Sequence, residues 1–319
     1  ADQTIQQATG KEFDSYFYDH FDNSKILANS DISITKNIEL LGSTIDMQNN
    51  KLSLGGMMYG GVLENAILDG GTIHNMTFTG SLTIEGKVIS DEGNVITCGL
   101  IVQDSLISQE YGGGSHYYEM TCQEDVTNNG YIGDYSSGDG LRLFLSGENI
   151  TDNGEWKNAF NVLNRDGDQF LTQGNGGSFA GEFSTDKTNG QLFAASDLSF
   201  QTGLNLNGAH IDMQGNILRI GGFLKNGEVT NAGLQGGLLS DIIIYEQLRI
   251  KGAVTIDEGN TFNADVIVED TIQSNVYGGG AHNYELTING SVINMGLIRE
   301  QVNGDNLNLH ITGNITNGG

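Results

Sequence analysis

The chain carries much of its own sequence twice, at an offset of about 166 positions that marks an internal repeat. Asp91–Asn94 recurs as Asp257–Asn260, and Tyr111–Gly114 recurs as Tyr277–Gly280. Roughly four in ten positions between Ile26 and Gly147 are identical to their counterparts, far more than shared composition gives. Solenoid repeats recur about every 20 to 50 residues, so this longer period predicts two tandem modules, each a domain in its own right.

The duplication divides the sequence into four parts. We expect an N-terminal docking segment at 1–25, a first module at 26–147, a connector or insert at 148–191 and a second module at 192–319. A chain of 319 residues is long enough for two separate cores. A duplication doubles a surface or a symmetry element, whereas an enzyme site is usually built once, so structural or multivalent use is favoured.

Short apolar runs separated by Gly, Asn or Asp fill the two modules. Ile32–Ile34, Ser81–Ile84 and Leu141–Leu145 show the alternation of β-strands. The chain has 47 Gly and no Pro, which indicates many tight turns between regular strands. The sequence therefore predicts an all-β protein. The pattern of apolar residues, Asn and Gly in Val62–Gly80 resembles that of stacked β rungs. A β-helix-like fold, a sandwich and a jelly roll all remain possible folds for the modules.

Aromatic residues mark the N-terminal segment. Phe13, Phe17 and Phe21 recur every four residues with Tyr16 beside them, a spacing that predicts one face of a short helix. The segment, helical or extended, either packs on its own domain or docks into a neighbouring subunit. We take these four side chains as the candidate partner contacts.

The charge balance limits the partners. There are 14 Lys and Arg against 40 Asp and Glu, a net charge of −26, which repels a nucleic-acid backbone. This charge favours solubility and repulsion between copies, with calcium or a basic partner as the alternatives. No stretch approaches the roughly 18 apolar residues that span a bilayer. Ala1 is compatible with removal of an initiator Met or of a signal peptide, although no signal peptide is visible.

The two cysteines occur only in the first module. Cys98 and Cys122 correspond to Ala264 and Ile288, so the fold does not require a disulfide. Buried free thiols are favoured over a bridge. No cluster of Cys and His with zinc spacing is present.

Two motifs are shared by the modules and carry candidate ligands. The turns of Asp91 and Glu92, and of Asp257 and Glu258, are expected to be hairpin turns, with calcium as the alternative and no other cofactor.

The glycine-rich loops precede His116 and Glu119 in the first module, and His282 and Glu285 in the second. A structural turn is favoured over a phosphate loop or a metal site, because no Lys-Ser/Thr follows and no third ligand lies nearby. No nucleophile motif is present, and we predict no catalytic centre.

Two further segments, Thr77–Gly86 and Leu204–Asn216, alternate apolar residues with Asn and Gly, and the second contains Ile-Asp-Met. This sequence pattern resembles that of the β-rich parts of bacteriophage tail-fibre and baseplate proteins. The resemblance implies a structural part of a virion, often trimeric, without a cofactor. No family residue can be carried over to this sequence.

We therefore predict a self-assembling structural subunit of an extracellular or virion assembly. Its partners are other copies of itself, as a trimer or polymer, and a carbohydrate or protein on a host surface. Three chains with two modules each would match a threefold part to a sixfold one. Two alternatives stay open: a subunit of a cellular filament or adhesin assembled by strand addition, and a polysaccharide-cleaving β-helix enzyme.

Overall fold

The computed structural model describes residues 3–19, 24–111, 115–135, 139–174, 177–302 and 304–318. The described residues contain strands and turns and no helix, so the all-β prediction is confirmed. The architecture is a parallel β-solenoid of about 15 turns, which makes the β-helix-like alternative right and the sandwich and jelly roll wrong. No described helix has the length and apolarity needed to cross a membrane.

The chain forms two compact units, residues 1–165 and 166–319. Unit 1 contains β1 (Gln3–Ile5), β2 (Phe17–Tyr18), β3 (Lys25–Ala28), β4 (Ile32–Ile34), β5 (Ile38–Glu39), β6 (Thr44–Asp46), β7 (Lys51–Leu54), β8 (Met57–Asp69), β9 (Thr72–Ile84), β10 (Lys87–Ser90), β11 (Asn94–Ile96), β12 (Leu100–Val102), β13 (Ser105–Ser108), β14 (His116–Cys122), β15 (Val126–Asn128), β16 (Tyr131–Gly133), β17 (Asp139–Leu145), β18 (Asn149–Asp152), β19 (Glu155–Trp156) and β20 (Phe160–Leu163).

Unit 2 contains β21 (Gln169–Gln173), β22 (Glu182–Thr185), β23 (Leu192–Ala194), β24 (Leu198–Phe200), β25 (Gly203–Asn205), β26 (His210–Asp212), β27 (Ile217–Ile220), β28 (Phe223–Gln235), β29 (Leu238–Ile250), β30 (Val254–Ile256), β31 (Asn260–Val268), β32 (Thr271–Ser274), β33 (His282–Ile288), β34 (Val292–Asn294), β35 (Leu297–Arg299), β36 (Asp305–Ile311) and β37 (Ile315–Asn317).

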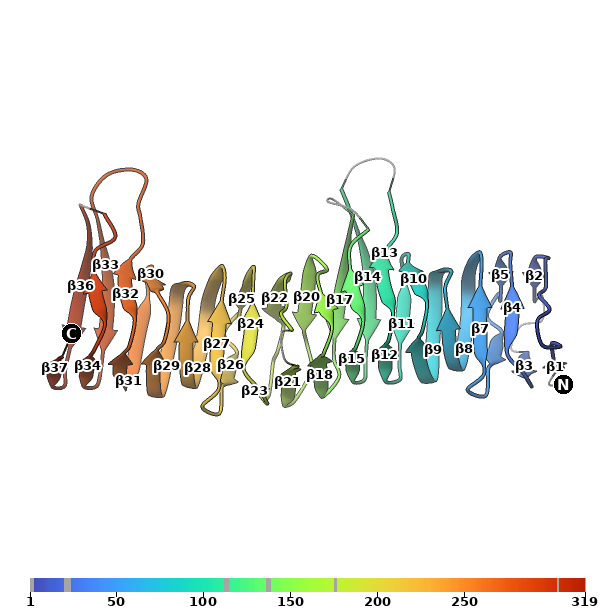
Figure 1. Cartoon of the computed structure of the whole chain (residues 1–319), viewed down its shortest axis with the longest axis horizontal. Helices are drawn as coiled ribbons and strands as arrows, with labels where there is room; N and C mark the ends of the chain where they lie inside the picture. Colours follow the sequence, from blue (N-terminus) through green and yellow to red (C-terminus); the bar gives the residue numbers. More distant parts are fainter. Residues whose placement is uncertain are drawn as a thin grey trace. The chain divides into compact units, whose positions relative to one another are not determined.

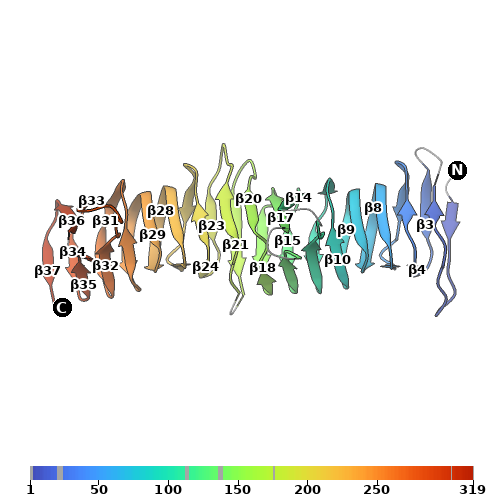
Figure 2. The ribbon, with the colours of Figure 1, turned by 90° about the horizontal axis from the view of Figure 1, so that it is seen from above.

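Most turns of the solenoid consist of three short strands, whereas β8 and β9 each span a complete turn as one long strand. In unit 1, β10 pairs in parallel with β13, β13 with β16 and β16 with β19, and the two strands that follow each of them pair in the same way. Figures 1 and 2 show the strands of successive turns side by side within each unit. Because each turn hydrogen-bonds only to its neighbours, the structure is built up turn by turn.

One long strand makes a complete turn at the centre of unit 1. Successive stretches of β8 pair with β5, β6 and β7, and its other edge pairs with β9. Asn65 bends the chain at a corner with a φ of 49°, a conformation that Asn tolerates better than most residues. Its counterpart in β28 of unit 2, Asn231, has a φ of 54°. The unusual backbone of this turn is therefore repeated in the second unit.

The strand bounds recur at the offset seen in the sequence. β28 and β29 are the counterparts of β8 and β9, and β33 is the counterpart of β14. The recurrence also covers residues that sequence identity did not align, because β1 and β2 correspond to β21 and β22. The described residues of 148–191 contain strands β18 to β22, so the strand pattern continues through the expected connector.

The core is the interior of the turns. In β14 the inward residues Tyr118, Met120 and Cys122 are buried, and their register partners in β17 are all leucines. Cys98 and Cys122 are free and buried, as expected from their absence in the second module. Burial raises the pKa of Cys98 to about 11 and that of Cys122 to about 12, so both thiols are unreactive near neutral pH.

Candidate functional site

The turn at Asp91 forms a corner between two faces of the solenoid. Both flanking strands, β10 and β11, pair in parallel with β9, so the prediction of a hairpin turn is wrong. The side chain of Asn94 holds the corner from inside: its Nδ2 donates to the carbonyls of Asp91 (2.7 Å) and Ile73 (3.0 Å), and its Oδ1 accepts from the Met76 N–H (3.1 Å). The buried side chain of Asn94 thus cross-links the backbone of this corner from inside, and we call it the plug of the corner.

The counterpart turn in unit 2 has the same plug. Asn260 Nδ2 donates to the carbonyls of Asp257 (2.7 Å) and Leu239 (2.9 Å), and Oδ1 accepts from the Ile242 N–H (3.2 Å). Glycine is required beside the plug of unit 1: Gly93 has a φ of 74°, and a Cβ there would clash with the Oδ1 of Asn75. The shared Asp-Glu-Gly-Asn sequence therefore follows from the geometry of the corner.

His116, which follows the glycine-rich motif in the sequence, lies at this same corner. In unit 1 the Nε2 of His116 lies 2.5 Å from Oε1 of Glu92, so two motifs that are separate in the sequence form one site. The imidazole is stacked against Tyr111 at a centroid distance of 5.1 Å and meets the edge of Tyr118 at 4.6 Å. We call Glu92, Tyr111, His116 and Tyr118 the loop site of unit 1.

Unit 2 repeats the arrangement with little change. His282 Nε2 lies 2.9 Å from Glu258 Oε1, and the ring is stacked on Tyr277 at 5.0 Å and tilted against Tyr284 at 4.6 Å. These four residues are the loop site of unit 2. In Figure 1 the segment between β32 and β33, which carries Tyr277, arches beyond the ends of the neighbouring strands.

A buried aspartate anchors each loop. The backbone N–H of Tyr111 donates to Oδ2 of Asp139 (3.0 Å), and that of Tyr277 donates to Oδ2 of Asp305 (2.9 Å). Burial, with the nearby carboxylates, raises the pKa of Tyr118, so its phenol stays protonated at neutral pH. The loop site can thus fix an exposed tyrosine and an imidazole–carboxylate pair at the solenoid surface.

His116 and Glu119, weighed as a pair of ligands against the favoured structural turn, do not lie on the same face of the strand. Glu119 lies three positions further along the strand and points outward, where its Oε1 accepts from Nη1 of Arg142 at 3.2 Å. In unit 2, Asn308 occupies the place of Arg142 opposite Glu285. The two histidines and the two glutamates therefore belong to different surfaces.

The calcium candidates do not converge on a cation. One carboxylate oxygen of Asp91 accepts the N–H of Glu92 at 2.8 Å, and Glu92 is engaged by His116. Throughout the part of the chain that the structure describes, no group of three or more His, Cys, Asp or Glu could hold a metal ion. The described residues around Asp91, Glu92, Asp257 and Glu258 therefore do not form a set of ligands for calcium.

The described part of the N-terminal aromatic segment is extended, so the helix that the spacing suggested is not formed and the extended alternative holds. Phe17 lies in β2, which pairs with β5, and Phe13 bridges to Ile34. Phe13 and Tyr16 are 38% and 57% exposed, whereas Phe21 lies outside the described residues. The spacing of four arises because Phe13 and Phe17 stand on neighbouring faces of one turn.

Sequence reasoning missed the contact between Glu92 and His116. A usable signal was present, because both residues recur at the common offset as Glu258 and His282. It also missed the counterparts of the N-terminal phenylalanines, Phe179 and Phe183, at the same offset.

No protein-family model, no curated protein and no solved structure matches the chain. The function therefore has to be argued from the geometry of the two units.

Proposed function

We propose that the chain is a structural subunit of an extracellular or virion assembly. It self-associates, and it contacts another surface through its two loop sites. The observation that carries this proposal is the recurrence of the loop site, with its buried anchor, at the same place in both units. A repeated surface feature on a scaffold of stacked strands suits a protein that binds or spaces more than one contact.

The differences between the units support a scaffold role. The apolar character of the inward residues and the corner turns are kept, while several outward residues of the same strands differ. Tyr117, Arg142 and Phe144 face outward in unit 1, and their counterparts are Asn283, Asn308 and His310. A scaffold needs its turns and its interior, and its outer faces are free to diverge.

The charge fits an assembly of separate contacts. With a net charge of −26, the overall electrostatic interaction between copies is repulsive. Local contacts, such as apolar surface buried between copies, would have to offset this repulsion. The same charge opposes adsorption to nucleic acid.

The filament or adhesin alternative shares most of this support. In this alternative the assembly is cellular and not viral, and its subunits are expected to join by adding a strand to an open sheet edge. For the enzyme alternative, one candidate among the described residues is Asp134, whose pKa burial raises to about 6, as it does that of Asp152. The carboxylate of Asp134 accepts the N–H of Leu141 at 2.7 Å, so it stabilises a strand start, and we favour the structural role.

Fractionation of the native source tests the proposal. A tagged chain, produced at its native level, is expected to sediment with particles or filaments, and electron microscopy with a gold label should place it on them. A chain found only as a free, slowly sedimenting species would contradict the proposal.

The loop sites are tested by replacing Glu92, His116, Glu258 and His282 together with Ala. Unchanged assembly with loss of surface contact would assign that contact to these residues. Unchanged assembly with loss of a turnover activity or of metal binding would overturn the structural role. Matched control substitutions at Asp197 and Glu269, which form ion pairs elsewhere on unit 2, should alter neither property.

A further inference from the structure

A groove on the surface of unit 2 is lined by cations and amides and by no carboxylate. It has a volume of about 370 Å³ and lies over β28 and β29. Its polar side chains are those of Gln214, Asn231, Gln247, Arg249 and Lys251. The chain has 40 Asp and Glu against 14 Lys and Arg, so a groove with two cations and no carboxylate stands apart from the rest of its composition.

The ammonium of Lys251 is not neutralised by the described part of the chain. Arg249 pairs with Glu269, and Arg219 on the neighbouring strand pairs with Asp197 at 3.0 Å. The exposed Lys251 side chain has no ion pair and no hydrogen bond with any described residue. The groove therefore presents one uncompensated positive charge, which attracts an anion.

The equivalent positions of unit 1 hold a complete ion pair. Glu85 stands at the position of Lys251, and Lys51 stands at that of Ile217. The Nζ atom of Lys51 lies 2.7 Å from Oε2 of Glu85. This face of the solenoid thus accommodates an ammonium and a carboxylate side by side, and unit 2 has the ammonium without a carboxylate next to it.

The amide side chains of the groove also differ from their counterparts. Those of Gln214, Asn231 and Gln247 form no hydrogen bond with the residues that the structure describes. The counterparts in unit 1 each donate a hydrogen bond within the chain: Gln48 to Asn29 (3.4 Å), Asn65 to Asp46 (3.2 Å) and Ser81 to Asn49 (3.2 Å). The amide groups of unit 2 are therefore available to a ligand.

Gly233 keeps the floor of the groove open. It lies inside β28, where glycine weakens a strand and often marks the close approach of another molecule. The backbone does not require glycine here, because a Cβ would meet Ile217 at 3.4 Å and Lys251 at 3.5 Å, which are ordinary contacts. The counterpart in unit 1 is Ile67, which carries a large side chain at this place. The glycine therefore shapes the groove and is not needed by the fold.

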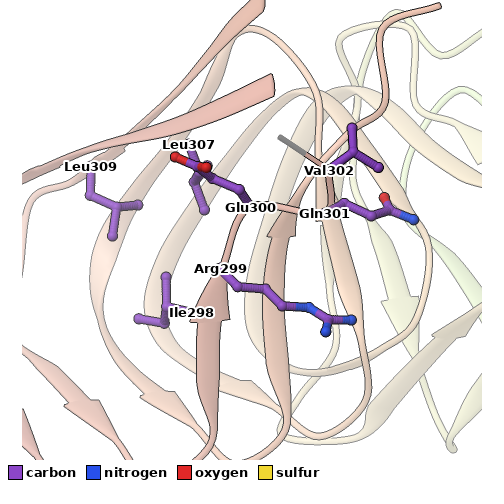
Figure 3. A pocket seen from close by; sticks show the side chains of 7 residues that line it. All are labelled: Ile298, Arg299, Glu300, Gln301, Val302, Leu307 and Leu309. Atoms are coloured by element: carbon purple, nitrogen blue, oxygen red, sulfur yellow. The ribbon is translucent and has the colours of Figure 1, made fainter. Parts of the chain in front are cut away.

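A larger cavity of unit 2 lacks this combination. It has a volume of about 770 Å³, and its lining includes Arg299 and Glu300. The Nε and Nη2 atoms of Arg299 donate to Oε1 of Gln273 at 3.3 and 3.1 Å. Figure 3 shows the carboxylate of Glu300 on the side of Leu307, away from the guanidinium of Arg299. With a carboxylate in its lining and its arginine bonded within the chain, this cavity does not favour an anion.

We propose that the groove over β28 and β29 binds a glutamate or aspartate carboxylate in a segment of another protein. Lys251 supplies the charge, and the amides of the groove bond to the peptide groups beside the carboxylate. This inference rests on the proposed structural role and names the chemistry of one partner.

The charges around the groove select an isolated carboxylate. Arg219 and Arg249 are already paired, so the groove compensates one negative charge. The net charge of −26 repels ligands with many negative charges, such as nucleic acids and polyuronic acids. An amide side chain has both a donor and an acceptor, as a peptide group has. One ammonium among three amides therefore fits a single carboxylate within a neutral stretch of polypeptide.

Amide NMR of the full chain tests the inference with two capped peptides, which carry a central glutamate or a central glutamine among glycines. We expect the glutamate peptide to shift the signals of Gly233, Arg249 and Lys251 with a Kd of about 1–10 mM, because a single exposed charge pair contributes little. The glutamine peptide should bind roughly tenfold more weakly. Binding of the glutamate peptide should weaken between about 0.05 M and 0.5 M salt.

Three variants separate the groove from the overall charge. Lys251→Gln should weaken binding of the glutamate peptide roughly tenfold. Gly233→Ile introduces the residue of unit 1 and should weaken binding by a similar factor with the charge unchanged. Lys225→Gln is the matched control: it removes the same charge from a lysine that lies over the ring of Phe223 at 4.2 Å, and it should leave binding unchanged. Circular dichroism checks the fold, and Lys251→Gln decides alone if Gly233→Ile is unfolded.

Equal binding of the two peptides, no binding of either, or equal effects of Lys251→Gln and Lys225→Gln would overturn the inference. Tighter binding of a polyuronic acid, or a shift of the Lys251 signal when the chain alone is concentrated, would also overturn it, because a polysaccharide or a second copy would then be the occupant. A chain that binds neither peptide and still sediments with native particles would overturn the inference and leave the proposed function standing.

Discussion

The two units share strand positions and corner turns, yet they treat equivalent side chains differently. Phe179 and Phe183 are enclosed in unit 2, whereas Phe13 and Tyr16 of the equivalent turn in unit 1 are exposed. The reverse holds at the other end of the module, where Leu141 is enclosed and Leu307 is partly open. Equivalent sequences thus acquire different burial because burial depends on whether a turn is stacked above them.

The largest expected difference is at these phenylalanines. Phe183→Ala should destabilise the chain by about 3–5 kcal/mol, because it leaves a cavity between Phe179 and Phe200. Phe17→Ala, at the half-buried equivalent, should cost less than about 2 kcal/mol. Urea unfolding gives the free energies, and hydrogen exchange at Phe200 and at Ile34 shows which unit loosens. Equal costs would break the comparison between the two units.

The corner plugs should behave alike in both units. Asn94→Ala removes three hydrogen bonds to backbone groups and Asn260→Ala removes four, and each should cost about 2–3 kcal/mol. Thermal unfolding of both variants measures this. A difference of more than about 1 kcal/mol between them would show that the corners are not equivalent.

A buried carboxyl group distinguishes unit 1. Asn128 Nδ2 donates to Oδ1 of Asp152 at 2.8 Å, and in unit 2 Asn294 donates to Asn317 at 2.8 Å. Burial raises the pKa of Asp152 to about 6 from 3.8. The native state therefore holds its proton more tightly than the unfolded state does, so the stability due to this group is present at pH 4 and is lost as the pH rises towards 6.

Asp152→Asn copies the unit 2 pair into unit 1. At pH 7 it should stabilise the chain by about 2 kcal/mol, and at pH 4 the effect should be close to zero. Denaturant unfolding at both pH values measures the difference. Asp197→Asn, which removes a carboxylate from an exposed ion pair in unit 2, is the matched control for the substitution itself. A variant that is destabilised at pH 7 would contradict this account of the buried carboxylate.

The smallest effect is expected for the exposed ion pair. A double-mutant cycle on Glu119 and Arg142 should give a coupling of less than about 1 kcal/mol, and Glu285→Ala should be neutral. A coupling well above that value would mean that this face of unit 1 is more ordered than its exposure indicates.

The fold could be predicted only in part. The alternation of apolar and polar residues in Ile32–Ile34 and Leu141–Leu145 correctly predicted strands. A strand that buries one face shows this alternation whichever strand it pairs with. The same alternation suits a sandwich, so it could not select a solenoid. The helix expected at Phe13 and Phe17 was wrong because a turn corner between two short strands also separates residues by four.

The site was also predictable only in its pieces. The repeated Tyr-Gly-Gly-Gly loops and Asp-Glu-Gly-Asn turns were visible as separate motifs, and the turns were expected to be structural. That His116 reaches Glu92 could not be read from either motif, because the contact depends on the register between neighbouring turns.

The sequence by itself determined the strand content, the positions of the turns between strands and the recurrence of one half of the chain in the other, since these depend on local backbone preference and on alternation within each segment. The tertiary structure decided the rest: which strands stack, that Glu92 meets His116, and that Phe183 is enclosed while Phe13 is open. Stacking joins residues that are a full turn apart, and the length of that turn is set by its loops and corners, which leave no periodic trace in the sequence.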